Sequence, residues 1–217
     1  LTSRTERTPV QLFPIWENPP AADKMVEPHF TMLWASQIPR VILTDAAGRE
    51  SEVQLVAGAL AGQRAPAPPP ASWASRAEAD VAIWPMRMQA GAELVVPAAA
   101  SAETRRNLYF FAGDAVPIGD QKLAKHARVA GRTDPPVTIR AESYAELLLR
   151  TGRPLGGQAA QYAPHGMNTP AQIEQAFADY RRTRFGEWSF DSDDPTHGPE
   201  PRRFAVHAGG RREEPPA

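Results

Sequence analysis

The sequence has no cysteine among its 217 residues. This absence excludes disulfides, cysteine-ligated zinc, iron–sulfur clusters and a thiol nucleophile. No apolar stretch approaches the ~20 residues that a membrane span needs, and the first eight residues are polar, unlike a signal peptide. We therefore expect no membrane partner and a cytoplasmic protein. The chain begins with Leu1 rather than Met, so we expect a fragment or a processed product.

The chain also lacks an excess of charge of either sign, with 24 basic and 25 acidic side chains. Binding to phosphates needs Lys and Arg concentrated on one face, so we expect no nucleic-acid partner. Proline is abundant instead, at 23 residues, with 15 glycines beside it. Because proline breaks helices and interrupts central strands, the composition predicts an all-β fold of short strands joined by turns.

Alternation of apolar and polar residues predicts strands along most of the chain. Their spacing of about 8 to 12 residues is typical of sandwiches and barrels. The segment 61–75 is rich in Pro and Ala, which predicts an exposed loop, because proline cannot donate to a strand ladder. The predicted strands are 40–45, 52–59, 79–88, 93–96, 107–111, 116–118, 127–130, 137–140 and 145–150, with extended pieces at 10–18 and 24–34.

One helix is predicted, from about 170 to 184. Thr169 can serve as its N-cap, with Pro170 at the first helical position and Gln172 completing a capping box. Apolar residues then recur at helical spacing, which favours one buried face. The residues after this helix are rich in Pro, Gly, Asp and Arg, so a flexible tail is expected at 188–217.

Four stretches of the sequence resemble elements of the pirin family, and they occur in the family's order and spacing over roughly residues 10–187. "IWENPP" followed by "KMVEPHF" is similar to the passage "LWVNLP…KMxxPxY" that links the two domains of a pirin. "VAGALAG" resembles "VxxIAGExxG", and Ala90-Gly91-Ala92 is placed like the "PGA" turn. Residues 150–169 are similar to "AGEPLxEPVxxxGPFVMNT". These matches lie at 15–20, 24–30, 56–62, 90–94 and 150–169.

The resemblance implies a fold for the parent protein: a pirin is a bicupin, with two β-barrels face to face. This chain would supply the C-terminal half, an antiparallel β-sandwich of the cupin type. On that basis residues 1–35 are a linker and strands that join a preceding barrel, and 36–168 are the C-terminal cupin barrel. Residues 169–187 are a C-terminal helix and 188–217 a flexible tail. The expected partner is the N-terminal cupin domain of the same parent.

The resemblance also implies a chemistry. The N-terminal barrel of a pirin carries one iron on three His and one Glu. Some bacterial relatives oxidise flavonols such as quercetin with dioxygen, and mammalian relatives act as nuclear transcription co-regulators. In the family those ligands lie upstream of the region that this chain matches, so none is transferred to a residue here. Iron or another divalent transition metal is therefore expected in the N-terminal barrel and not in this chain.

The sequence itself predicts a barrel without metal ligands. A cupin metal site needs a His-x-His pair, a Glu a few residues later and a third His, all on one inward face. At the corresponding place after Gly91 the sequence has Leu94-Val95-Val96-Pro97, and Glu103 has no histidine before it. We therefore expect an apolar, metal-free pocket, and we predict no catalytic, cofactor-binding or metal-binding residue in this chain.

The remaining candidate residues have inter-domain or structural roles. None of the five histidines lies within five residues of another. Glu27 and His29 could share a strand face, but a lone pair makes a poor metal site, so His29 is expected to hydrogen-bond at the domain junction. His165 can cap or pack against the helix, or bind a ligand. The full set is Trp16, Asn18, Lys24, Met25, His29, His165 and Asn168.

Two functions stay open at this point. In the first, the chain is the C-terminal, metal-free cupin domain of a pirin-like, iron-dependent dioxygenase of the quercetinase type. It would then cap the catalytic barrel and shape the substrate cleft. In the second, it is a non-enzymatic protein-interaction or transcription co-regulator module. Such a module would bind a protein partner through its sheet edge, its Pro-rich loop or its tail.

Overall fold

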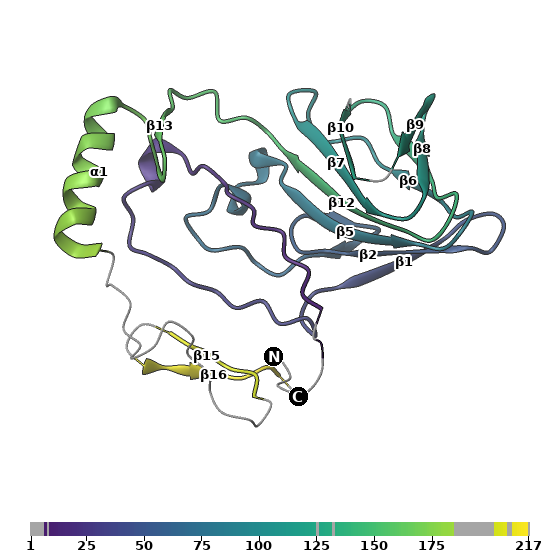
Figure 1. The fold of residues 1–217 in the computed structure, drawn as a ribbon, viewed down its shortest axis with the longest axis horizontal. Helices are drawn as coiled ribbons and strands as arrows, with labels where there is room; N and C mark the ends of the chain where they lie inside the picture. The colour runs from purple at the N-terminus through teal and green to yellow at the C-terminus, as the bar shows by residue number, and fades with distance from the viewer. Residues whose placement is uncertain are drawn as a thin grey trace. The chain divides into compact units, whose positions relative to one another are not determined.

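The computed structural model describes residues 7, 9–124, 126–131, 133–184, 202–207 and 210–216. The chain forms two compact units, of which one is Thr31–Leu155 and the other combines Leu1–Phe30 with Gly156–Ala217. Of the described strands, β1 to β12 belong to Thr31–Leu155, and β13 to β16 belong to the other unit (Figure 1). Of the helices in the described residues, none has both the length and the apolar character that crossing a membrane demands.

Six antiparallel strands form the larger sheet of Thr31–Leu155, in the order β1-β2-β5-β12-β7-β10. The central strand β12 is rich in leucine, and Leu147 and Leu149 are 0% and 1% exposed. The bounds are β1 Arg40–Thr44, β2 Glu50–Gln54, β5 Ala82–Met88, β7 Arg105–Ala112, β10 Ala127–Gly131 and β12 Ala145–Gly152.

Four strands form the smaller sheet, in the order β6-β11-β8-β9. Successive side chains on a strand point to opposite faces, and the inward faces of the two sheets close over one apolar core. Leu94, Val116 and Ile139 come from the smaller sheet, and Trp84 and Phe110 from the larger one. This is the all-β, cupin-type barrel that the sequence predicts. The bounds are β6 Glu93–Val96, β8 Ala115–Ile118, β9 Gln121–Ala124 and β11 Val137–Arg140.

The Pro-rich segment 61–75 is mostly loop, with short ordered pieces. β3 (Ala59–Leu60) and β4 (Gln63–Arg64) form a small hairpin at its start. The 3-10 helix η2 (Trp73–Ser75) lies at its end, followed by η3 (Ala77–Ala79). Trp73 donates its ring N–H to the carbonyl oxygen of Arg153 at 3.0 Å, which ties the segment to the chain beyond β12.

The extended pieces predicted at 10–18 and 24–34 do not form strands of a sheet. The structure has no strand in the described residues before β1, where the one regular element is the 3-10 helix η1 (Ala21–Asp23). Pro14, Pro19 and Pro20 lack backbone donors, and in the part of the chain that the structure describes no strand pairs with this segment. Its apolar side chains are consequently exposed, among them Leu12 at 78% and Trp16 at 80%.

The predicted helix is confirmed as α1, Pro170–Thr183. Thr169 and Gln172 form the predicted capping box, and Ile173 and Ala176 are buried. The helix packs against a hairpin of β13 (Ala160–Tyr162) and β14 (His165–Met167). In the region predicted as a flexible tail, residues 188–201 lie outside the described residues. The described part contains a second hairpin, of β15 (Ala205–Val206) and β16 (Arg212–Glu213).

Asp45 links the two sheets of the barrel. It lies in the β1–β2 turn, where its Oδ1 accepts from the backbone N–H groups of Ala47 and Arg49 at 2.8 and 3.0 Å. Its Oδ2 accepts from Arg49 Nε at 2.9 Å and from the backbone N–H of Glu93, on β6, at 3.1 Å. These hydrogen bonds together lower the pKa of Asp45 to about 2, and the bond from the backbone N–H of Arg49 has the largest effect on the pKa.

We expect Asp45 to contribute to stability at neutral pH and to lose that contribution in acid. The carboxylate has a lowered pKa in the folded state, so its stabilisation is complete above the ordinary Asp pKa of about 4. It is lost as pH falls from about 4 towards about 2. Thermal unfolding should therefore show Asp45→Asn below the wild type at pH 7, with the difference shrinking in acid. A difference that is constant from pH 7 to about pH 3 would contradict this role.

Candidate ligand cavity of the barrel

The inward face of β6 is apolar. Leu94 and Val96 are each 3% exposed and point into the barrel, whereas Val95 between them is 57% exposed and points out. Glu103, the nearest following carboxylate, forms an ion pair with Arg153. Within the described ranges, no three His, Asp or Glu side chains lie close enough together to hold a metal ion. The residues of this interior therefore do not fit a cupin metal centre.

A cavity of about 690 Å³ lies inside the barrel. Both sheets contribute to its wall, which is mainly aliphatic. A volume of this size is in the usual range for sites that bind small molecules. Asp120, Gln121 and Thr138 add polar groups to its lining. The apolar lining side chains include Val96, Leu108, Ile118, Val129, Val137, Ile139 and Leu149.

Arg106 also lines this cavity, from an inward-facing position on β7. It shares strand parity with Leu108 and Phe110, and it is 6% exposed. Its Nη2 donates to the carbonyl oxygen of Pro97, directly after β6, at 2.5 Å. Burial lowers the pKa of the guanidinium, and the nearby carboxylate of Asp80 opposes that shift. An arginine keeps its charge in proteins, so the interior holds a buried cation.

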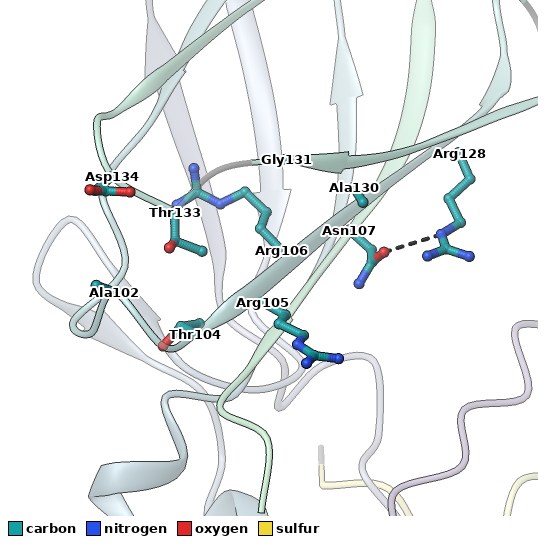
Figure 2. Close-up of a pocket in the computed structure, with 10 residues that line it drawn as sticks. All are labelled: Ala102, Thr104, Arg105, Arg106, Asn107, Arg128, Ala130, Gly131, Thr133 and Asp134. Atoms are coloured by element: carbon teal, nitrogen blue, oxygen red, sulfur yellow. Dashed lines mark hydrogen bonds between the residues drawn. The ribbon is translucent and has the colours of Figure 1, made fainter. Parts of the chain in front are cut away.

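A second cavity, of about 570 Å³, lies on the other side of Arg106. Figure 2 shows Arg106 reaching from β7 towards Thr133, whereas the adjacent Arg105 points away from it. Arg128 donates from Nε to Asn107 Oδ1 at 3.1 Å across the β7–β10 pair. Both cavities are lined by Arg106, together with Ala130 and Gly131 of β10.

Comparison with protein families identifies the family to which the barrel is related. Residues 83–186 match the model of the "Pirin C-terminal cupin domain". The chain contains a pirin C-terminal cupin domain. The resemblance to the pirin family that the sequence motifs indicate is thereby confirmed.

Curated relatives of this pirin domain include two Pseudomonas aeruginosa proteins, each named "Putative quercetin 2,3-dioxygenase". One is 28% identical over 178 residues, or 81% of this chain and 57% of the relative. The other is 26% identical over 171 residues, or 78% of this chain and 57% of the relative. The chain therefore spans a little over half the length of the curated relatives that it matches.

Solved structures confirm the cupin fold of the pirin domain. A crystal structure of quercetin 2,3-dioxygenase from Acinetobacter baumannii superposes with a TM-score of 0.65 at 24% identity, covering 78% of this chain and 55% of that chain. A second quercetin 2,3-dioxygenase structure from the same organism gives a TM-score of 0.55 at 12% identity, covering 76% of this chain and 52% of that chain.

The structure brings together two of the five site residues predicted before the pirin barrel. Lys24 donates through Nζ to Asn18 Oδ1, and also to the carbonyl oxygen of Pro19 at 3.1 Å. Partial burial lowers the pKa of Lys24. Trp16 and Met25 are 80% and 73% exposed, and His29 is also exposed. Their predicted inter-domain role stays a prediction.

The other two predicted residues, His165 and Asn168, belong to the segment in front of α1. The His165 ring lies edge-on to Phe177, with centroids 4.7 Å apart, and Tyr180 is 6.1 Å away. Asn168 donates from Nδ2 to the carbonyl oxygen of Gln158 at 2.8 Å. These contacts give His165 a packing role and give Asn168 a role in closing the β13–β14 hairpin.

Sequence reasoning missed Arg106, and the predicted purely apolar pocket is wrong on this point. The strand was predicted at 107–111, two residues short of the true start of β7 at Arg105. The signal was present in the parity of the strand, because position 106 alternates in phase with Leu108 and Phe110. Because the predicted strand begins at 107, it assigns no face to Arg106.

We expect His165 to anchor α1 through ring packing. Edge-to-face ring contacts contribute about 0.5–1.5 kcal/mol beyond the area that they bury. His165→Phe should therefore leave amide hydrogen exchange in α1 close to that of the wild type, whereas His165→Ala should raise it. Equal exchange rates in α1 for the two variants would show that the ring does not anchor the helix.

Proposed function

We propose that this pirin domain is the metal-free half of a two-barrel quercetin 2,3-dioxygenase. Iron or another divalent transition metal would be held by an N-terminal cupin barrel of the same parent protein. The names of the two Pseudomonas relatives support the substrate class. The lengths of those relatives support the second barrel, because the chain spans 57% of each. In this proposal the chain caps the catalytic barrel and borders the substrate cleft.

The observation that carries the proposal is the inward face of β6. Leu94 and Val96 stand where the resemblance to the family would place metal-ligating side chains of a cupin, and both are buried in the apolar core. An aliphatic side chain offers no lone pair to a metal ion. The metal chemistry of a quercetin dioxygenase would consequently have to come from side chains outside this interior.

The segment before β1 supports contact with another protein surface. Val10, Leu12, Trp16 and Met25 are between 73% and 80% exposed. Exposed apolar side chains that follow one another along the chain favour an interaction site. In the proposed parent, the preceding barrel covers them. The same exposure also favours the second candidate function, a non-enzymatic module that binds a protein partner through this segment.

The test compares the longer protein, which contains a preceding cupin barrel, with residues 1–217 alone. Both are loaded with Fe(II), and quercetin-dependent oxygen uptake and bound metal are measured. We expect the longer protein to retain metal and consume oxygen, and residues 1–217 alone to do neither. Trp16→Ala should weaken the association of the two barrels in the longer protein and lower its turnover. Val95→Ala, at an exposed position of the barrel, serves as the matched control.

Three results would contradict the proposal. Stoichiometric metal bound by residues 1–217 alone would place the metal site in this barrel. A metal-loaded longer protein that does not turn over quercetin would remove the substrate assignment. Loss of turnover in Val95→Ala as large as that in Trp16→Ala would show that the exposed segment has no special role. If the longer protein does not turn over quercetin but binds a protein partner, and if Trp16→Ala abolishes that binding, the interaction module is favoured.

A further inference from the structure

We propose that the cavity beside Arg106 binds a small organic carboxylate with an aromatic or branched aliphatic body. The carboxylate group would lie on the Arg106 guanidinium, and the apolar body would fill the space between the two sheets. This site belongs to the pirin barrel itself. It does not depend on the proposed dioxygenase function or on a second barrel.

The first argument is the position of the charge. Arg106 is 6% exposed on the inward face of β7, where the next two inward positions hold Leu108 and Phe110. Removing a guanidinium from water is costly, and an apolar side chain of similar volume is often as stable or more stable in such a place. The Pro97 carbonyl oxygen and the Asp80 carboxylate offset part of this cost, so a ligand would add to the partners that Arg106 already has. A charged side chain on an inward face that also lines a cavity favours a role in ligand recognition.

The second argument is the composition of the cavity. Its volume of about 690 Å³ suits a small molecule, and aliphatic side chains from both sheets form most of its wall. Burying an apolar body against this wall is favourable in proportion to the area removed from water. An inorganic anion would make no apolar contact with that wall, and a neutral apolar molecule would make no ion pair with Arg106. A carboxylate with an apolar body makes both.

The third argument is the charge around the site. The planar guanidinium matches the geometry of a carboxylate, to which it can donate two parallel hydrogen bonds. Asp120 lines the same cavity, and Asp80 influences the guanidinium electrostatically. These acidic side chains reduce the positive potential of the site. They favour a ligand with one negative charge over a phosphate with two.

The experiment uses NMR on the complete 15N-labelled chain. Benzoate, benzamide and sulfate are titrated separately to about 10 mM, and the Arg106 Nε–Hε signal and backbone amides are followed. Benzoate and benzamide have the same ring and differ in charge, so their comparison needs no variant. We expect benzoate to shift the Arg106 signal and to bind about tenfold more tightly than benzamide, with no saturable effect of sulfate.

Matched variants separate the charge from the cavity. Arg106→Met should remove the preference for benzoate, whereas Arg105→Met, at the adjacent exposed position, should keep it. Val129→Phe, at a partly buried cavity position on the edge strand β10, should weaken both benzoate and benzamide by filling the space. Any of four results would overturn the proposal: no binding of benzoate, equal binding of benzoate and benzamide, sulfate binding as tight as that of benzoate, or an unchanged preference in Arg106→Met.

Discussion

The alternation of side chains along the barrel strands is the constraint on which the rest of the structure depends. Two sheets close over one core, so every second residue of each strand must suit an apolar interior. On β6 these residues are Leu94 and Val96, and on β12 they include Leu147 and Leu149. A barrel that fills its inward positions in this way gains stability from burial. Aliphatic residues then fill inward positions that the converging imidazoles and carboxylates of a cupin metal centre would need.

Arg106 departs from this pattern, and it changes what the interior can do. A barrel with a purely aliphatic interior can pack, but it has no means of selecting a charged ligand. One buried guanidinium beside an apolar cavity supplies that selectivity. Among its described residues, the pirin domain thus combines a core without a cluster of metal ligands and a buried cation, Arg106, placed where a ligand could meet it. In the proposed two-barrel protein, these features would divide metal chemistry and ligand recognition between the two halves.

Much of the barrel can be predicted from the sequence where local patterns and tertiary packing agree. The strands at 93–96 and 137–140 have the predicted bounds, because turns on both sides define them. The capping box of Thr169 and Gln172 likewise identifies α1 through local hydrogen bonds alone. The apolar alternation at Val10, Leu12 and Trp16 misleads because a strand needs a neighbour, and this segment has none in the described residues. Arg106 is missed because the predicted strand begins at 107, although its parity with Leu108 and Phe110 indicates an inward position. The pairing of β7 with β10 and β12 shows that the strand includes it.

The most direct test of the central claim, that this barrel does not hold the metal, is anomalous X-ray diffraction from crystals of the proposed two-barrel protein after it has been loaded with metal. Data collected at the absorption edge of the bound metal give anomalous difference peaks that identify each ion and place it relative to the protein. The predicted result is an anomalous peak within the preceding cupin barrel and none among the inward side chains of residues 36–168. A peak inside this barrel, beside Leu94, Val96 or Arg106, would contradict the claim.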